Sequence, residues 1–262
     1  MPESSAERVA QALREDILTG RYRAGDRLPS ERDLVERLGV NRGAVREGLR
    51  ELSQLGLVEV GPGGARAGRL EHASLDIVGH LLDLHEVPDA TLVDQVLEVH
   101  AHLFSSSVRM SLERASDETL AQVCAHLRAI QAEDLSHTEY LEHLHEVVHL
   151  MVDSSGNFVL RLMRRALELQ FWDRLGGADG FSVRVPQEIL APLAARLGAA
   201  IADRNAHEAQ DLVFELMTQH REAVTKLLSA EQTRAISDFM AGHLSHLLEP
   251  PSSRIAPDRT DA

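Results

Sequence analysis

Three arginines recur at four-residue spacing between residues 42 and 50, in a stretch whose apolar periodicity predicts a helix. Arg42, Arg46 and Arg50 then lie along one face, because residues four apart are neighbours on a helical surface. Guanidinium groups in such a row suit contacts with phosphates and with the edges of guanine bases. The sequence therefore indicates a basic ridge that binds nucleic acid.

The residues before this ridge predict a short helix and a tight turn that would position it. Ser30 can cap the first helix, and Gly39 can end it in the left-handed conformation that glycine adopts with least strain. Asn41 can cap the second helix, which runs to about Ser53. Both helices carry an inward apolar stripe, formed by Leu34, Val35 and Leu38 in the first and by Val45, Leu49 and Leu52 in the second. Two helices joined in this way, the second one basic, are typical of a helix-turn-helix.

The flanking residues complete a small domain. Residues 7–19 predict a helix, and residues 57–60 and 65–69 predict two strands joined by a glycine-rich turn. Because this hairpin directly follows a helix-turn-helix, we interpret it as a wing, and a plain flexible hairpin is the alternative. A tip containing Gly63 lets backbone approach DNA closely, and Arg66 could follow it into the minor groove.

This stretch resembles the N-terminal winged helix-turn-helix domain of the GntR family of bacterial transcription regulators. Two positions depart from the family pattern: Ala44 stands where Thr or Pro is frequent, and Gly48 where Ala is frequent. Ala44 removes one side-chain DNA contact, and Gly48 should weaken the recognition helix by up to about 1 kcal/mol. The matching residues are Gly25-Asp26-Arg27-Leu28-Pro29-Ser30-Glu31-Arg32-Asp33-Leu34, Leu38-Gly39-Val40-Asn41-Arg42, Val45-Arg46-Glu47, Leu49, Leu52 and Gly56-Leu57-Val58.

The resemblance implies which side chains contact DNA. The leading contacts are Arg32, Asn41, Arg42 and Arg46, and the secondary ones are Gly43, Gly63 and Arg66. Gly43 has no side chain to block approach to a sugar or a base. For Arg32 and Arg46 an alternative role stays open, as partners of nearby acidic residues in structural salt bridges.

The charge of the chain agrees with DNA binding only when it is divided between two parts. The net charge is −14, but residues 1–70 hold 12 arginines against 11 acidic residues, and the acidic excess lies after them. DNA binding must therefore come from arginines gathered on one face of the small domain. The single cysteine, Cys124, excludes an internal disulfide. The absence of an apolar N-terminal run and of a membrane-spanning stretch predicts a cytoplasmic protein with no membrane partner.

The remaining residues predict helices and no strands. We therefore expect a mainly α protein with a winged helix-turn-helix domain at 1–70, an all-helical effector-binding and dimerisation domain at 71–248 and a disordered tail at 249–262. The clearest break between helices is the loop Gly176–Gly180, and Asp89, Ser116, Ser136, Asn157 and Asn205 are plausible caps. The expected helices span residues 73–84, 89–114, 117–133, 136–154, 157–175, 185–203, 206–228 and 230–248.

The helical part resembles the effector domains of the FadR subfamily of GntR regulators, with Ser154-Ser155-Gly156-Asn157 as the most recognisable match. Many of these domains, of the FCD type, bind a metal through one Asp and three His. Ungapped alignment places Leu144 and Val148 at the first two ligand positions, and neither side chain can ligate. A shift of one residue would bring in His145 and His149, with His220 near the last ligand position. We favour ordinary helix histidines here and keep a divalent metal as the alternative.

Loss of the metal ligands makes the domain more similar to the acyl-CoA-responsive FadR proteins. Ser74-Leu75-Asp76-Ile77-Val78 and Leu92-Val93-Asp94 match that branch. We therefore predict a transcription regulator, not an enzyme, that binds a pseudo-palindromic double-stranded operator as a homodimer and responds to a small acid or an acyl-CoA. The predicted hinge between the domains is Arg69 to Ser74, and the effector is expected to lower operator affinity.

The alternative is a helical metal-dependent enzyme or a metal-binding domain. Its site would lie on the histidine-rich helix at 142–149, with Glu142, Glu146, His145 and His149. No HExxH string occurs, and that alternative gives the DNA-binding domain no role.

Overall fold

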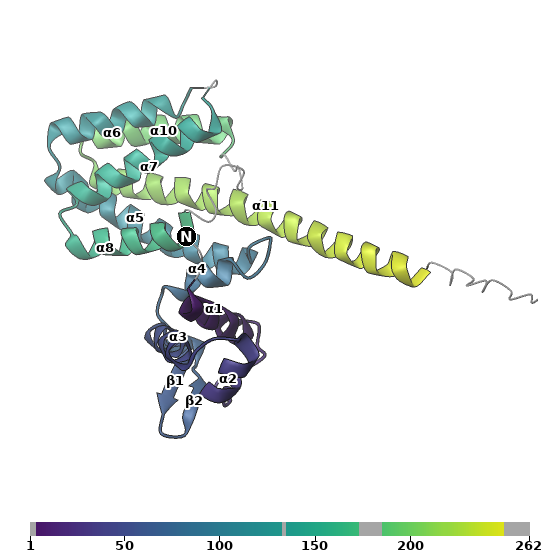
Figure 1. Cartoon of the computed structure of the whole chain (residues 1–262). Coiled ribbons are helices and arrows are strands. Elements are labelled where there is room, and N and C mark those ends of the chain that lie inside the picture. The colour runs from purple at the N-terminus through teal and green to yellow at the C-terminus, as the bar shows by residue number, and fades with distance from the viewer. Residues whose placement is uncertain (1–3, 133–134, 173–184, 249–262) are drawn as a thin grey trace, which may run out of the picture.

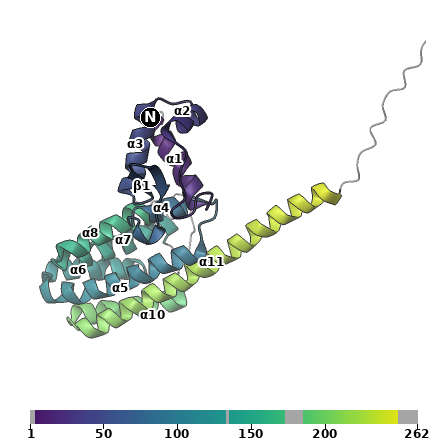
Figure 2. The same cartoon turned by 90° about the horizontal axis from the view of Figure 1, so that it is seen from below.

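The computed structural model describes residues 4–132, 135–172 and 185–248. A small domain of three helices and a hairpin lies below a larger helical bundle, and the last helix runs out well past that bundle (Figures 1 and 2). This confirms the predicted fold class of a winged helix-turn-helix followed by helices. None of the helices that the structure describes is long and apolar enough to cross a membrane.

The small domain contains α1 (Ser5–Leu18), α2 (Glu31–Leu38), α3 (Arg42–Gln54), β1 (Val58–Gly61) and β2 (Gly64–Ala67). The strands pair antiparallel, with Val58 opposite Ala67. The predicted caps are confirmed: Ser30 accepts from the backbone of Asp33, and Gly39 ends α2 at φ +63°. Most of the apolar residues that the sequence directed inward form one buried core, which includes Val9, Leu13, Ile17, Leu34, Val45, Leu49 and Leu52. Val35 and Leu38 of α2 are only partly buried against it.

Gly48 lies where α1 crosses α3, and its missing side chain has a packing role that the sequence did not indicate. A Cβ placed on Gly48 would lie 2.9 Å from both Cβ and Cγ1 of Val9 and 3.0 Å from the carbonyl oxygen of Ala6. These distances are shorter than van der Waals contact. Gly48 therefore costs helix propensity but allows α1 and α3 to pack closely, and the two effects predict opposite signs for the stability change of a substitution there.

We expect Gly48→Ala to lower the free energy of unfolding by about 1–3 kcal/mol, because the added methyl group overpacks the contact with Val9. Helix propensity alone would raise it by up to about 1 kcal/mol. Chemical denaturation of the full chain decides between the two signs. The double variant Val9→Ala/Gly48→Ala should recover part of the loss. An increase in stability for Gly48→Ala alone would contradict the close-packing account.

A short connection joins the two parts of the chain. The 3₁₀ turn η1 (Leu70–His72) precedes α4 (Ile77–Leu82), which is shorter than the predicted span of 73–84. Ile77 is buried in the core of the small domain. Leu82, one turn further on, is buried in a separate cluster with Phe171, Val224 and Leu228. A single short helix therefore packs into both parts.

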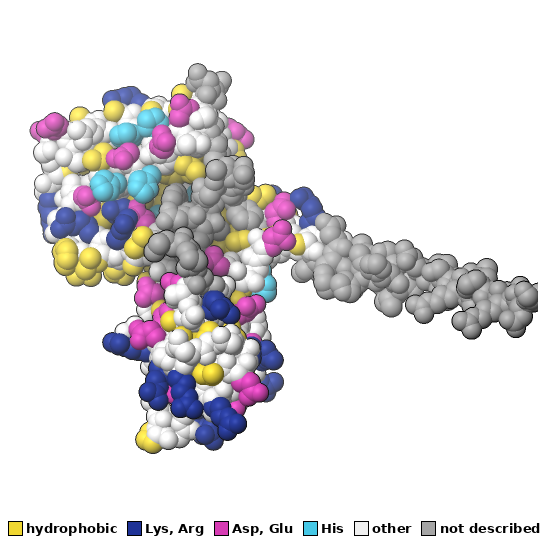
Figure 3. All heavy atoms as spheres, in the orientation of Figure 1, with side chains coloured by type: hydrophobic (Ala, Val, Ile, Leu, Met, Phe, Trp, Pro, Cys, Tyr) yellow, Lys and Arg dark blue, Asp and Glu magenta, His cyan; other side chains and the backbone are white. Residues whose placement is uncertain are grey.

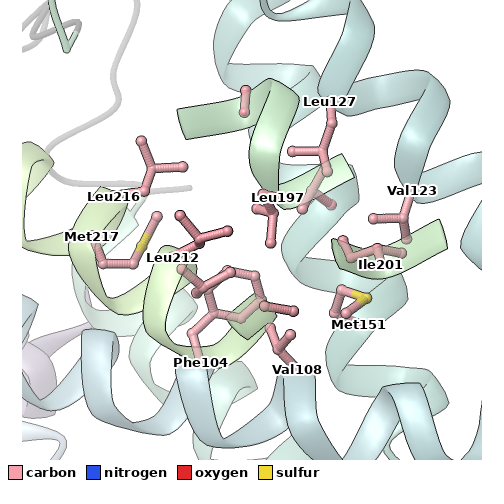
Figure 4. Packing of buried hydrophobic residues seen from close by; sticks show 14 of the residues in the cluster. Phe104, Val108, Val123, Leu127, Met151, Leu197, Ile201, Leu212, Leu216 and Met217 are labelled. Carbon is pink, nitrogen blue, oxygen red and sulfur yellow. The ribbon is translucent and has the colours of Figure 1, made fainter. Parts of the chain in front are cut away.

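The bundle is formed by α5 (Ala90–Arg114), α6 (Asp117–Ala129), α7 (His137–Ser154), α8 (Phe158–Leu167), α10 (Gln187–Ala202) and α11 (Ala206–Leu248). Asp89, Ser116, Ser136, Asn157 and Asn205 each accept a hydrogen bond from the backbone nitrogen three residues later, so all five predicted caps are confirmed. The core lies between α5, α6, α7, α10 and α11 and includes Phe104, Val108, Met151, Leu197, Ile201 and Leu212 (Figure 4).

Two predictions for the helices were wrong. The expected helices 206–228 and 230–248 are one continuous helix, α11, because no glycine or proline interrupts the sequence between them. The expected helix 157–175 changes at Glu168 from α8 to a π-helical turn, η2 (Glu168–Trp172). The predicted loop at 176–180 and the tail at 249–262 lie outside the described residues.

Candidate nucleic-acid interface and effector cavity

The basic ridge lies on the exposed side of α3 in the small domain. The side chain of Asn41 caps this helix, with its Oδ1 accepting from the backbone nitrogen of Ala44 at 2.9 Å. Val45 and Leu49 are buried against the domain core, which turns Arg42, Arg46 and Arg50 to solvent. Figure 3 shows arginine side chains gathered over the small domain.

Arg46 is held in place by an acidic residue on the preceding helix. Its Nε donates to both carboxylate oxygens of Glu31, at 3.0 and 3.1 Å. This pairing raises the pKa of Arg46, first through the hydrogen bond to Glu31 and then through the charge of that carboxylate. The contact spans the turn between α2 and α3 and uses Nε, so the terminal nitrogens of the guanidinium remain available to contact a base or a phosphate. Sequence spacing could not reveal it, because the two residues are 15 positions apart.

The other predicted contacts on these helices are exposed. Arg32 and Arg42 form no hydrogen bond or ion pair with any residue that the structure describes. Gly43 lies in the first turn of α3, where an added Cβ would come within 3.1 Å of Asn41 Oδ1. A side chain at that position would therefore crowd the cap as well as an approaching sugar.

The wing is tied back to the domain at its base. Gly63 lies exposed at the tip of the hairpin, and Gly64 has φ +102°. The guanidinium of Arg66 donates from Nη1 to the backbone carbonyl of Gly25 at 2.8 Å. The side chain of Arg66 therefore contacts the loop before α2, so it must leave that carbonyl if it is to reach into a groove.

A second candidate site lies inside the bundle, where α5, α7, α8, η2 and α11 meet. It is a cavity of about 40 Å³ with mainly apolar walls. Space of this size holds roughly two or three water molecules. Five polar side chains reach the walls: His100, His145, Arg164, Glu168 and His220. The apolar walls are formed by Val96, Leu97, Leu144, Val148, Leu167, Phe171 and Met217.

Arg164 and Glu168 provide most of the charge in this cavity. They form an ion pair one turn apart, and the same carboxylate lies 3.7 Å from Nε2 of His145. The side chain of Arg164 is only 13% exposed, and its buried Nε makes no hydrogen bond to any described residue. An arginine with a buried donor still available is suited to bind an anion that enters the cavity.

His100 of α5 lines the same cavity. Burial is the largest cause that lowers its pKa to about 4, followed by the charges of the neighbouring His220 and Arg164. His100 is therefore neutral at physiological pH, although an anion placed between it and Arg164 would favour its protonated form.

This shift predicts how stability depends on pH. The unfolded chain binds a proton at His100 below about pH 6.5, whereas the folded chain does so only near pH 4, so the free energy of unfolding should fall as pH decreases through this window. The slope from this one group is at most about 1.4 kcal/mol per pH unit. His100→Gln should flatten that part of the curve in urea denaturation series. If the free energies of unfolding of variant and parent differ by the same amount at every pH from 4 to 6.5, the pH dependence does not come from His100.

The three alternative metal ligands, His145, His149 and His220, do not form one site. His145 and His220 line the cavity, but Nε2 of His149 lies 3.4 Å from Asp153 on its own helix. The rings of His145 and His149 stack with their centroids 6.5 Å apart. Within the described residues, no group of three or more His, Cys, Asp or Glu side chains is arranged to hold a metal ion. The donor set therefore does not fit the metal that the FCD type would imply.

The sequence of this chain is similar to those of known bacterial regulatory proteins. Residues 5–66 match the family model described as bacterial regulatory proteins, gntR family. The chain is 36% identical over 170 residues to the HTH-type transcriptional regulator Mce2R of Mycobacterium tuberculosis, covering 64% of this chain and 70% of that protein. It is 31% identical over 160 residues to a fatty acid metabolism regulator protein of a Shewanella species, covering 60% and 63% of the two chains.

A solved structure supports the fold as a whole. The Listeria monocytogenes protein Lar, described as controlling the expression of the agr system, superimposes with a TM-score of 0.52. The match covers 87% of this chain and 99% of that one, at 14% sequence identity. The shared feature is therefore the arrangement of a winged helix-turn-helix and a helical domain.

Proposed function

Because this chain belongs to the GntR family of bacterial regulatory proteins, we propose that it binds a pseudo-palindromic operator as a homodimer and releases it when a small acid binds in the bundle. Family membership makes it a DNA-binding transcription regulator and not an enzyme. The alternative of a helical metal-dependent enzyme is set aside on that finding.

The exposed arginine face of α3 is the observation that carries the DNA-binding site. We place α3 in the major groove, with Arg42 and Arg46 toward base edges and Arg32 and Asn41 on phosphates. Gly43, Gly63 and Arg66 are secondary contacts, where backbone or wing approaches the sugar–phosphate chain. Glu31 supports this proposal, because a base-reading arginine that is already oriented loses less conformational entropy when it binds.

The cavity in the bundle supports an anionic effector with a short apolar body. Arg164 would receive the carboxylate, while residues such as Leu144 and Phe171 would contact the hydrocarbon part. Glu168 already pairs with Nη1 of Arg164, so the ligand would compete with this carboxylate for the guanidinium. Of the two effector classes the sequence suggested, a small acid requires the smaller expansion of a cavity of about 40 Å³, and an acyl group would require the cavity to open much further.

The connection between cavity and DNA-binding domain runs through η2 and α4. Glu168 and Phe171 of η2 line the cavity, and Phe171 also packs in the cluster that contains Leu82 of α4. Nε2 of Gln170 donates to Asp76, just before α4, at 3.4 Å. π-Helical turns inside helices are frequent at functional sites. Displacement of Glu168 would shift this turn and with it the base of the DNA-binding domain.

These contacts favour α4 as the moving element over the expected hinge at Arg69 to Ser74. The backbone nitrogens of Gly68 and Ser74 donate to Leu57 and Leu55 at 2.8 and 2.9 Å, which ties that segment to the small domain. Residues 69–74 would then move together with the domain, and the change in angle would arise where α4 meets η2.

The proposal is tested with the full chain and an operator selected from a random DNA library. Small carboxylates and acyl-CoAs are titrated against the protein–operator complex, and binding is followed by fluorescence anisotropy. We expect a carboxylate to weaken operator affinity by a coupling of about 1–3 kcal/mol. Native mass spectrometry of the purified protein identifies any acid that it retains. If ligands bind the protein but leave operator affinity unchanged, the effector switch is refuted and the bundle serves only in dimerisation.

A further inference from the structure

The loop before α2 adds a short strand segment to the wing, which the spacing of residues did not indicate. Arg27, in that loop, forms an antiparallel bridge with Arg66 of β2. The residues on either side of this pair are joined across it by two backbone hydrogen bonds of 2.9 Å. Arg27 and Arg66 are therefore the kind of antiparallel pair whose side chains lie closest together.

The pair places two positive charges directly opposite each other on an exposed face. Like charges at such cross-strand positions destabilise a sheet. Glu59 lies opposite Arg66 on its other side, in the register of β1 and β2, but it forms no ion pair with either arginine among the residues that the structure describes. A local conflict of this kind is expected at a functional site, where a ligand can supply the missing counterion.

Both guanidinium groups lie beside the hairpin. Nη1 of Arg66 donates to the backbone carbonyl oxygen of Gly25 at 2.8 Å. A Cβ built at Gly64 would lie 3.7 Å from both Nε and Nη2 of Arg27, so this guanidinium lies alongside the backbone at the end of the hairpin turn. Its N–H groups form no hydrogen bond with any part of the chain that the structure describes. Arg27 therefore offers a set of unused donors next to a second, anchored guanidinium.

We propose that Arg27 and Arg66 together bind one phosphate group of the operator backbone. This inference rests on the proposed function, because it adds a contact to the same DNA interface. A phosphate group accepts several charge-assisted hydrogen bonds, and its negative charge offsets the repulsion between the two guanidinium groups. Arg66 keeps its bond to Gly25 through Nη1 and donates to the phosphate from its other nitrogens. The side chain therefore binds DNA without entering the minor groove.

The proposed contact differs in kind from that of Arg46. Arg46 is oriented by the carboxylate of Glu31 and directed at base edges, whereas no described carboxylate pairs with Arg27. A contact to a phosphate positions the domain on the duplex but carries no sequence information. It also displaces a counterion, so it contributes to the salt dependence of binding.

Salt titrations of the full-length Arg27→Ala variant test this site, on the selected operator and on a scrambled duplex. We expect about tenfold weaker binding to both duplexes. The slope of log affinity against log salt concentration should decrease in magnitude by about one. Arg27→Lys should keep most of the slope. The matched control is Arg69→Ala, which removes an exposed arginine that is paired with Glu71 at 3.0 Å, and it should leave the slope unchanged.

The thermal unfolding temperature of Arg27→Ala should not fall, since the substitution relieves a repulsion. A folded Arg27→Ala variant with unchanged affinity and slope would overturn the proposal, and so would a loss confined to the selected operator. If Arg46→Ala weakens binding and Arg27→Ala does not, this site alone is refuted. A parent protein that binds no DNA refutes the proposed function instead.

A scan of the operator with single methylphosphonate groups, which are uncharged, locates the phosphate. In the parent protein, one such substitution beside the wing in each half-site should weaken binding. The same substitution should have little further effect on the double variant Arg27→Ala/Arg66→Ala, because both of its partners are already gone. If every methylphosphonate weakens the parent and the double variant equally, the two arginines do not bind the backbone.

Discussion

Replacing Arg46 by alanine is expected to weaken binding to the specific operator by about 1–3 kcal/mol, or roughly 5- to 150-fold. Arg46 occupies the centre of the exposed ridge on α3, and its paired contact with Glu31 holds the guanidinium in one orientation. A bidentate arginine contact to guanine would supply a discrimination of this size. Fluorescence anisotropy with the specific operator and with a scrambled duplex measures both the loss and its specificity.

Two matched variants separate base reading from simple charge. Arg46→Lys keeps the charge but lacks the planar fork, so it should lose nearly as much specific affinity as alanine. Glu31→Gln keeps the arginine but removes the anion that orients it, and should give a smaller loss. Equal weakening on the specific and scrambled duplexes would assign Arg46 to the phosphates, and full retention of operator affinity in Arg46→Ala would remove it from the interface.

The second large effect is expected at Arg164. Arg164→Ala should weaken binding of a carboxylate effector by about 2–5 kcal/mol, because it removes one partner of a buried charge pair and leaves the acid without a counterion. The operator complex of this variant should then be insensitive to the acid at concentrations that dissociate the parent complex. Calorimetric titration of ligand into the full chain measures the first effect, and anisotropy measures the second.

The neighbouring residues provide the controls for Arg164. Arg165→Ala, on the next residue, removes the same charge from a side chain that is 65% exposed and lies 3.9 Å from Glu168, and should change ligand affinity far less than Arg164→Ala. Glu168→Gln should raise ligand affinity, since the competing carboxylate is lost. If Arg165→Ala weakens ligand binding as much as Arg164→Ala does, the acid does not bind in the cavity through Arg164.

The parts of the structure that could be predicted from sequence are those that depend on neighbours along the chain. Ser30, Gly39 and Asn41 act locally, as caps and as a left-handed helix end, so their types and spacing determine the helix-turn-helix. The same reasoning located the five helix caps of the bundle. Periodicity likewise assigned the buried faces of α1 and α3.

The parts that could not be predicted depend on residues that are far apart in the chain. Gly48 was interpreted through helix propensity, because nothing in the sequence places Val9 against it. The pairing of Glu31 with Arg46 and the convergence of His100, Arg164 and His220 on one cavity both require the tertiary fold. The π-helical turn that begins at Glu168 packs against α4, and helix propensities do not register such a contact.

The central claim is that two copies of this chain read one operator through α3. The most direct test is selection of bound sequences from a random duplex library, followed by measurement of the number of chains on the selected site by analytical ultracentrifugation. We predict two inverted half-sites with their centres about one helical turn, or 10 base pairs, apart, bound by two chains. Enrichment of no sequence, or of a single half-site bound by one chain, would contradict the account.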